Sequence, residues 1–302
     1  MSVKFSVEAF KKLDRFDFKI LNAIERGMSA YMYVPVEVIS SFSRLDVDFV
    51  MRRLKKLNTL GVVSRRLGAH TGYILTSRGY DCLAFNALVK RGTLESISAT
   101  PIGMGKEADV YVGITPAGKK VAVKFHRAGR TSFRGIRVKR AYAGERSHVS
   151  WLYLSRLAAK NEYQALQILS RERVSVPKPI DWTRHIVVTE FIEAVELSRV
   201  PKLNRPNIVL EKIIQNIKKA YRVGVVHGDL SEYNILVREN DEPVIFDWPQ
   251  WVPSNHPSAL ILLRRDFKNI LKFFKRKYGL NIKVEACLEK LVSEIAGERE
   301  ST

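Results

Sequence analysis

The stretch HGDLSEYN, at residues 227–234, places Asp229 five residues before Asn234 within one short segment. Ten residues further on, the apolar run VIF at 244–246 is typical of a strand, and it delivers the carboxylate of Asp247 at its end. Phosphoryl transfer needs groups of this kind, because the reaction uses oxygen ligands for a metal ion and a base beside the acceptor. The pattern therefore indicates a strand and loop arrangement suited to phosphoryl transfer.

Two segments upstream supply further parts of such a site. In IGMGKEADVY, at residues 102–111, Gly103 and Gly105 allow backbone N–H groups to approach phosphates, and an apolar strand follows. The run VAVK, at 121–124, is typical of a buried strand, and its final residue, Lys124, is a cation that can pair with phosphates. Each motif alone is a weak signal, whereas their order and spacing together are a strong one.

The first 92 residues carry a different pattern. Apolar residues recur at helical spacing between residues 5 and 24, a proline can open a second helix at residue 35, and Val47, Val50, Leu54 and Leu57 form one face of a third. Two strand-like runs then flank a glycine-bearing turn, and a helix follows over 79–89. This order resembles a winged helix-turn-helix domain, in which the third helix enters a major groove and the hairpin touches the nucleic-acid backbone.

Six cations of this segment are candidates for nucleic-acid contact. Four of them lie on the third helix and two on the hairpin: Arg52, Arg53, Lys55, Lys56, Arg65 and Arg66. Point charges of this kind suit contact with the phosphate backbone better than the reading of base edges. The alternative is a solvated helix face, which is how most runs of charge behave.

The charge of the whole chain agrees with a polyanionic partner. The 302 residues hold 51 Lys plus Arg against 31 Asp plus Glu, a net charge of +20, and are 46% hydrophobic. That apolar content excludes a disordered chain, and no apolar run approaches the length of a membrane span, so we expect a soluble, cytoplasmic protein. Residues 1–92 carry a net +8 and residues 127–160 another +8, so the excess lies in two places.

Taken in order, the motifs resemble those of the protein-kinase superfamily. Several departures identify a branch: Ala108 replaces the third glycine of the loop, Gly228 replaces the usual arginine, and Trp248 follows Asp247 in place of phenylalanine. Only 55 residues follow Asp247, and they contain no Ala-Pro-Glu segment. With a winged helix in front, the chain resembles a RIO-type atypical serine/threonine protein kinase of the winged-helix-bearing subfamily, of archaeal-like form.

The resemblance implies an α+β fold. A winged helix-turn-helix domain over residues 1–92 would precede a minimal bilobal protein-kinase-like (RIO) domain over 93–302. The small lobe would span about 93–192 and the large lobe about 193–302. A flexible basic loop is expected over 127–150, a stretch without sustained apolar periodicity. The resemblance makes Ser132 of that loop the candidate for autophosphorylation.

The resemblance also implies a role for each motif residue. Seven residues would bind ATP through its phosphates, through the phosphate-binding lysine or at the adenine-binding hinge: Gly103, Gly105, Lys106, Lys124, Glu162, Glu190 and Ile192. Glu162 would orient Lys124, although a solvated glutamate in a first helical turn is the alternative reading. Asp229 would be the catalytic aspartate, with Lys124 and Asp247 completing the catalytic set. Asn234 and Asp247 would be the metal ligands.

The function that follows is an ATP- and Mg²⁺-dependent kinase or ATPase, with Mn²⁺ as a possible substitute. Autophosphorylation or an aspartyl phosphate is expected, as is a role in maturation of the small ribosomal subunit. The partners would be ATP, the precursor particle and its ribosomal RNA, with no membrane; the sequence leaves the oligomeric state open and favours a monomer. One alternative is a small-molecule phosphotransferase of the antibiotic-kinase type. Another is a winged-helix regulator with an inactive kinase lobe, which the intact motif residues argue against.

Overall fold

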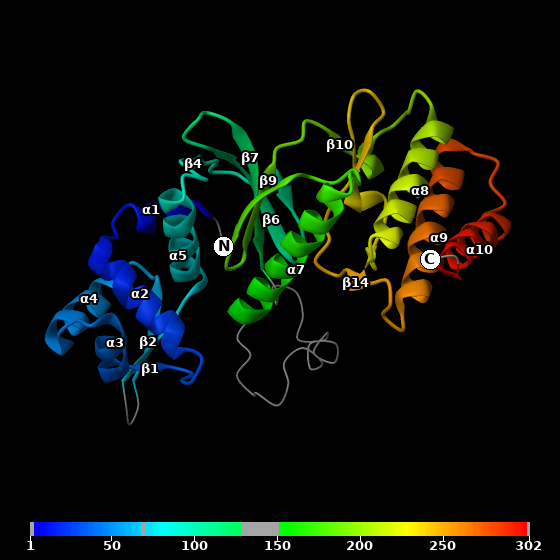
Figure 1. Cartoon of the computed structure of the whole chain (residues 1–302). Coiled ribbons are helices and arrows are strands. Elements are labelled where there is room, and N and C mark those ends of the chain that lie inside the picture. The colour runs from blue at the N-terminus through cyan, green and yellow to red at the C-terminus, as the bar shows by residue number, and fades with distance from the viewer. Residues whose placement is uncertain (1–2, 68–70, 128–150, 301–302) are drawn as a thin grey trace. The chain divides into compact units, whose positions relative to one another are not determined.

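The computed structural model describes residues 3–67, 71–127 and 151–300. The chain divides into two compact units, Met1–Leu157 with Thr183–Ile186 and Ala158–Trp182 with Val187–Thr302 (Figure 1). Among the described residues, no helix combines the length and the apolar character needed to cross a membrane.

The first unit begins with the predicted winged helix. Its helices and strands follow one another in the expected order: α1 Val3–Phe10, α2 Arg15–Gly27, β1 Val34–Pro35, α3 Val36–Ser43, α4 Val47–Thr59, β2 Val63–Arg66, β3 Gly72–Leu75 and α5 Ser77–Lys90. The three strands form an antiparallel sheet in the order β1-β3-β2. The winged-helix prediction is confirmed.

Polar caps and an apolar core explain why these helices form where they do. The side chain of Asp14 accepts from the backbone N–H of Asp17, and the side chain of Asp17 accepts in return, which makes a capping box at the start of α2. Leu21, Leu54 and Leu83, from three different helices, are 0–1% exposed and lie in one core. Val47, which was predicted on the buried face of α4, is 38% exposed because the helix begins there and turns it outward.

The same unit continues into the strands that carry the glycine loop and the lysine. These strands are β4 Ser96–Ile97, β5 Gly103–Met104, β6 Ala108–Ile114 and β7 Lys120–His126. β6 pairs antiparallel with β4, β5 and β7. Alternate residues of β7 are buried, so that Val121, Val123 and Phe125 face the interior while Lys124 lies on the other face.

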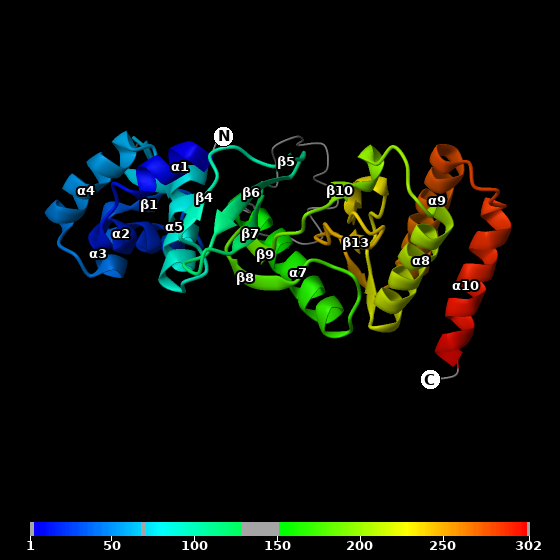
Figure 2. The same cartoon turned by 90° about the horizontal axis from the view of Figure 1, so that it is seen from above.

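The second unit holds the loop and strands around Asp229. Helix α7 Trp151–Arg171 begins in the first unit and continues into the second. The strands β8 Pro179–Thr183 and β9 Ile186–Glu190 follow, and residues 183–186 of this stretch belong to the first unit. The remaining elements of the second unit are β10 Val195–Glu196, η2 Leu197–Arg199, α8 Pro206–Arg222, β11 Val225–Val226, η3 Glu232–Asn234, β12 Ile235–Val237, β13 Pro243–Ile245, β14 Val252–Pro253, α9 Ala259–Tyr278 and α10 Val284–Glu300. Helices α8 and α9 lie side by side in both views, as do α9 and α10 (Figures 1 and 2).

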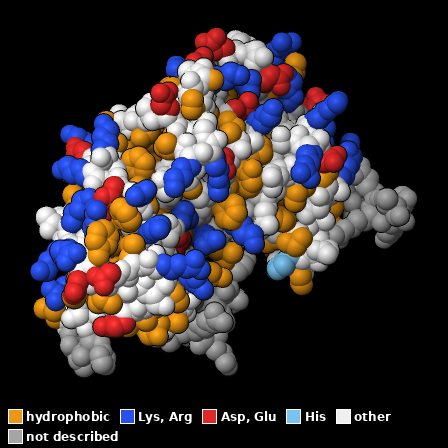
Figure 3. Space-filling model, turned by 60° about the vertical axis from the view of Figure 1, so that its left-hand side comes forward, with side chains coloured by type: hydrophobic (Ala, Val, Ile, Leu, Met, Phe, Trp, Pro, Cys, Tyr) orange, Lys and Arg blue, Asp and Glu red, His pale blue; other side chains and the backbone are white. Residues whose placement is uncertain are grey.

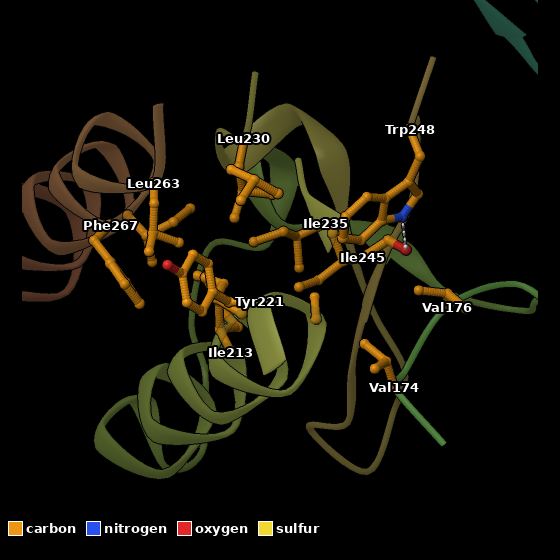
Figure 4. Packing of buried hydrophobic residues seen from close by; sticks show 14 of the residues in the cluster. Val174, Val176, Ile213, Tyr221, Leu230, Ile235, Ile245, Trp248, Leu263 and Phe267 are labelled. Carbon is orange, nitrogen blue, oxygen red and sulfur yellow. Dashed lines mark hydrogen bonds between the residues drawn. The ribbon is translucent and has the colours of Figure 1, made fainter. Parts of the chain in front are cut away.

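The core of the second unit lies directly beneath the HGDLSEYN segment. Leu230, within that segment, and Ile235, directly after it, point into the cluster with Trp248 and with Phe267 of α9 (Figure 4). All four are at most 1% exposed. Because Leu230 and Ile235 are buried in the core, packing places the polar residues beside them.

Candidate active site

Asp266 of α9 holds the backbone of the 227–234 segment in place. Its carboxylate oxygens accept hydrogen bonds from the backbone N–H groups of Gly228, at 2.8 Å, and of Leu230, at 2.9 Å. Asn269, one helical turn further on, donates to the carbonyl of Leu230 at 3.0 Å. Burial raises the pKa of the Asp266 carboxyl, although the two N–H donors and nearby cations oppose that shift. Sequence reasoning missed Asp266; the only signal was an aspartate within an apolar helical stretch.

Asp229 lies between these two anchored positions and faces outward. Its side chain is 71% exposed, and its Oδ1 lies 4.0 Å from a guanidinium nitrogen of Arg265, which also donates to the carbonyl of Gly228. The backbone carbonyl of Asp229 accepts from the side-chain amide nitrogen of Asn234 at 2.9 Å. That bond uses the donor end of the Asn234 amide and turns its acceptor oxygen, Oδ1, away from the carbonyl.

Asp247 is joined to the same segment through its preceding residue. The backbone N–H of Phe246 donates to the carbonyl of Asn234 at 3.0 Å, and the His227 ring lies within hydrogen-bond distance of the Phe246 carbonyl, at 3.1 Å. Asp247 itself has φ +67°, a left-handed conformation that is unusual for a residue with a side chain. Such strain, on the order of 1–3 kcal/mol, persists where the surroundings hold it.

Trp248 supplies much of that support. It is 1% exposed, its indole nitrogen donates to the carbonyl of Ile245 at 3.1 Å, and its ring packs against His227 with centroids 4.5 Å apart. His227 therefore braces the segment. The structure brings Asp229, Asn234 and Asp247 together through one hydrogen-bonded backbone network.

The glycine at position 228 is required by the backbone of the site. Its φ is +76°, and a Cβ there would lie 3.1 Å from the carbonyl oxygen of Gln250. We expect Gly228→Ala to lower the free energy of unfolding by about 1–2 kcal/mol and to reduce turnover, because it displaces the neighbouring Asp229. Denaturant unfolding and steady-state rates measure the two effects. Gly118→Ala, with φ +74° but no neighbour within 4 Å, is the control that should lose stability and keep its turnover.

The predicted phosphate-binding residues lie in register across three strands of the first unit. Gly103 is opposite Val110, and Val110 is opposite Lys124, so the glycine and the lysine lie at the same register position, on the two strands that flank β6. The N–H of Gly105 donates to the carbonyl of Ala108 at 2.8 Å and closes the turn. A Cβ on either glycine would meet nothing closer than 3.4 Å, so packing within the protein does not require glycine at these positions. Lys106, at the tip, is exposed.

The remaining predicted nucleotide residues belong to the second unit. Glu162 lies in the middle of α7 and is 3% exposed, so the alternative of a solvated glutamate in a first turn is wrong: the helix begins eleven residues earlier, at Trp151. Glu190 ends β9, where its N–H donates to the carbonyl of Lys178 at 2.9 Å. Ile192 follows two residues later and is half-buried.

The six basic candidates of the winged helix fall into two groups. Arg53 lies 2.5 Å from Asp14 and 3.3 Å from Asp17, and Lys56 lies 2.5 Å from Asp17, so both cations are neutralised within the domain. The other four are exposed: Arg52, Lys55, Arg65 and Arg66. Lys and Arg side chains are spread over the face shown in Figure 3, interrupted by small groups of acidic ones.

Arg127, which the sequence assigns to the basic loop, is in fact buried. It is 6% exposed, and its guanidinium binds Asp81 of α5 at 2.7 and 3.0 Å. The pairing with a carboxylate 46 residues away explains why no local pattern revealed it. Residues 128–150, with the candidate Ser132, lie outside the described residues.

A winged helix, a glycine turn beside a strand-borne lysine, and an Asp/Asn/Asp network define a winged-helix-bearing member of the protein-kinase superfamily. Residues 109–287 match the RIO domain and residues 10–91 match the domain described as Rio2, N-terminal. The chain belongs to the Rio2 family of RIO-type serine/threonine-protein kinases.

Individual relatives support this assignment over most of the chain. The chain is 41% identical to the RIO-type serine/threonine-protein kinase Rio2 of Methanocaldococcus jannaschii, over 82% of this chain and 92% of that protein. It is 36% identical to the serine/threonine-protein kinase rio2 of Schizosaccharomyces pombe, over 91% and 80%. A crystal structure of the Rio2 kinase-ADP/Mg²⁺-phosphoaspartate complex from Chaetomium thermophilum matches with a TM-score of 0.81 and 30% identity, over 98% of this chain and 99% of the other.

Proposed function

We propose that the chain is an ATP- and Mg²⁺-dependent kinase and ATPase that acts in maturation of the small ribosomal subunit. The observation that carries the proposal is the network of Asp229, Asn234 and Asp247. In it, the backbone carbonyl of Asp229 orients the Asn234 amide, and Asp247 is held in a strained, left-handed backbone conformation. The similar Rio2 kinase structure contains ADP, Mg²⁺ and a phosphoaspartate, which supports ATP as the nucleotide and a carboxylate as phosphoryl acceptor.

The donor set of Asn234 and Asp247 fits Mg²⁺. This ion is usually held by one or two protein oxygens together with substrate phosphates, and it does not need an all-protein cage. Accordingly, the described part of the chain holds no cluster of three or more His, Cys, Asp or Glu side chains that could bind a metal by itself. When bound, Mg²⁺ supplies charge neutralisation on the phosphate oxygens.

The roles of the other residues follow from their chemistry. The N–H groups around Gly103 and Gly105 bind phosphate oxygens, and the absence of any packing reason for these glycines agrees with close approach by a ligand. Lys124 pairs with the α and β phosphates, and the resemblance to the family makes Glu162 the carboxylate that would orient the lysine. The backbone of Glu190 and Ile192 meets the adenine.

Transfer to Asp247 is a balanced displacement at phosphorus. A carboxylate oxygen of Asp247 forms a bond to the γ-phosphorus of ATP, the bond from that phosphorus to the β,γ-bridging oxygen breaks, and ADP leaves with the electron pair. Water then attacks the acyl phosphate and releases inorganic phosphate and the free carboxylate. Residues 248–258 alone separate Asp247 from α9, which leaves little chain for a docking platform and favours this reaction over phosphorylation of free proteins.

The nature of the phosphoprotein tests this proposal. After incubation with ATP labelled at the γ-phosphate, we expect a labelled protein that loses its label in neutral hydroxylamine, because hydroxylamine cleaves acyl phosphates and leaves phosphoserine intact. Label that survives hydroxylamine and acid would point to autophosphorylation on serine. A wild-type protein that neither takes up label nor releases phosphate would contradict the proposed activity altogether.

The exposed cations of the winged helix support a polyanionic partner, and the family resemblance makes ribosomal RNA the candidate and the cytoplasm the expected location. We expect replacement of Arg52, Lys55, Arg65 and Arg66 by alanine to weaken binding to a ribosomal RNA fragment. The salt slope should fall by about 0.7–0.9 for each phosphate that the variant no longer neutralises. The matched control removes four exposed lysines elsewhere: Lys119, Lys202, Lys283 and Lys290. Equal losses of affinity in the two variants would show that only net charge matters and would contradict a binding surface on this domain.

A further inference from the structure

Asp81, in α5 of the winged helix, is the centre of a buried polar cluster that no motif contains. Its Oδ1 lies 2.7 Å from Nη1 of Arg127 and 2.8 Å from Nε2 of His185. Its Oδ2 accepts from Nη2 of Arg127 at 3.0 Å and from the hydroxyl of Ser6 at 2.7 Å. Asp81, Arg127 and His185 are 2%, 6% and 0% exposed. One carboxylate therefore satisfies three groups that reach it from three different parts of the chain.

The charges of the cluster are matched. The Arg127 guanidinium and the His185 ring outweigh burial and hold the pKa of the Asp81 carboxyl far below its usual range, so it is ionised. Burial lowers the pKa of His185 to about 4, so the ring is neutral at pH 7 and its Nε2–H donates to Asp81. The ring of Tyr80 stacks on His185 at 4.8 Å. The cluster therefore contains one buried ion pair, in which the two terminal nitrogens of Arg127 bind the two carboxylate oxygens of Asp81. This bidentate geometry restricts both side chains.

The two residues that Asp81 holds lie at the ends of the strands that carry nucleotide-binding residues. Arg127 follows β7 directly and comes three residues after Lys124. His185 directly precedes β9, which ends at Glu190. The N–H of His126, the last residue of β7, donates to the carbonyl of His185 at 2.8 Å, so the two strand ends are also joined to each other. Asp81 thus fastens the end of one strand and the beginning of the other.

We propose that Asp81 is a positioning residue for the ATP reaction: from the winged helix, its carboxylate fixes Arg127 and His185 and through them Lys124 and the strand that leads to Glu190. This inference rests on the proposed function, because it assumes that Lys124 and the residues after β9 bind ATP. A shift of a phosphate-binding group by a fraction of an ångström is enough to weaken its contacts.

Asp81→Asn tests the proposal, since asparagine keeps the shape and removes the charge that Arg127 faces. We expect the KM for ATP to rise roughly tenfold, with kcat within about twofold of wild type. Asp17→Asn is the matched control: Asp17 is a carboxylate with 0% exposure in the same domain, paired with Arg53 and Lys56 instead. It should lower the melting temperature and leave the KM for ATP unchanged.

The outcomes separate the inference from the function on which it rests. An unchanged KM in Asp81→Asn, or equal increases in both variants, would overturn the positioning role, because a general loss of stability would then suffice. If Asp81→Asn does not fold, Arg127→Lys serves in its place, because lysine keeps the charge and loses the bidentate contact. Its KM for ATP is then compared with that of Asp17→Asn. Absence of turnover in the wild-type protein would contradict the proposed function. The ratio of the KM for ATP in Asp81→Asn to that in Asp17→Asn tests only the positioning role of Asp81.

Discussion

Asp247→Asn is expected to reduce the turnover of Mg²⁺-ATP by at least about a thousandfold, as removal of a catalytic nucleophile does in other enzymes. Asparagine has one neutral carbonyl oxygen and no anionic oxygen, so it cannot accept the phosphoryl group as an acyl phosphate and binds Mg²⁺ more weakly. It tolerates the left-handed φ of +67° better than most side chains, so the fold should be retained. Phosphate release and the melting temperature, measured on the same sample, check both statements.

Asp241→Asn is the matched control for that experiment. Asp241 also has a left-handed φ, of +60°, and lies in the turn between β12 and β13. Its carboxylate accepts from the N–H groups of Asn204 and Arg205 at 3.1 and 3.2 Å, away from the Asp229 network. Its replacement should leave turnover unchanged. Wild-type rates in Asp247→Asn would remove Asp247 from both the metal-binding and the acceptor roles.

Deletion of residues 1–92 is expected to destabilise the strands of the nucleotide-binding sheet, in addition to removing RNA contacts. The deletion leaves Arg127 without its buried carboxylate, and it takes from Arg184 the two oxygens of Glu25 that lie at 2.9 and 2.6 Å. The deletion also removes Phe85, whose ring packs on that of Phe125 in β7. Exposing about two large apolar side chains that the domain covers costs about 3–5 kcal/mol. For a chain of this size, that loss corresponds to a fall in melting temperature of roughly 10 °C.

Circular dichroism and binding of a fluorescent nucleotide measure the effect of the deletion. The comparison is the variant with alanine at Arg52, Lys55, Arg65 and Arg66, which should lose RNA affinity while its melting temperature stays at the wild-type value, since these side chains are exposed. A fragment of residues 93–302 with wild-type melting temperature and nucleotide affinity would show that the winged helix is dispensable for the fold of the sheet.

Residues close together in the chain were predicted well. The glycine turn, the strand that carries Lys124 and the segment from Asp229 to Asn234 are each formed by a few consecutive residues, so their spacing carries the signal directly. The winged helix was predicted for the same reason, since local periodicity and capping residues such as Asp14 indicate its helices and hairpin. The start of α7 was missed: the helix begins at Trp151, eleven residues before Glu162, and the basic residues Arg156 and Lys160 interrupt its apolar pattern.

By itself, the sequence determined the kinase class, the order of the elements and the identity of the loop residues, because each depends on short contiguous patterns. Only the tertiary structure decided which charges are available. Arg53 is neutralised by aspartates 36 and 39 residues away, Arg127 by Asp81, and the Asp229 loop is anchored by Asp266. An ion pair forms where packing brings oppositely charged side chains of two segments together. Its desolvation depends on all the residues around it. The order of charges along the chain therefore cannot specify which ion pairs form.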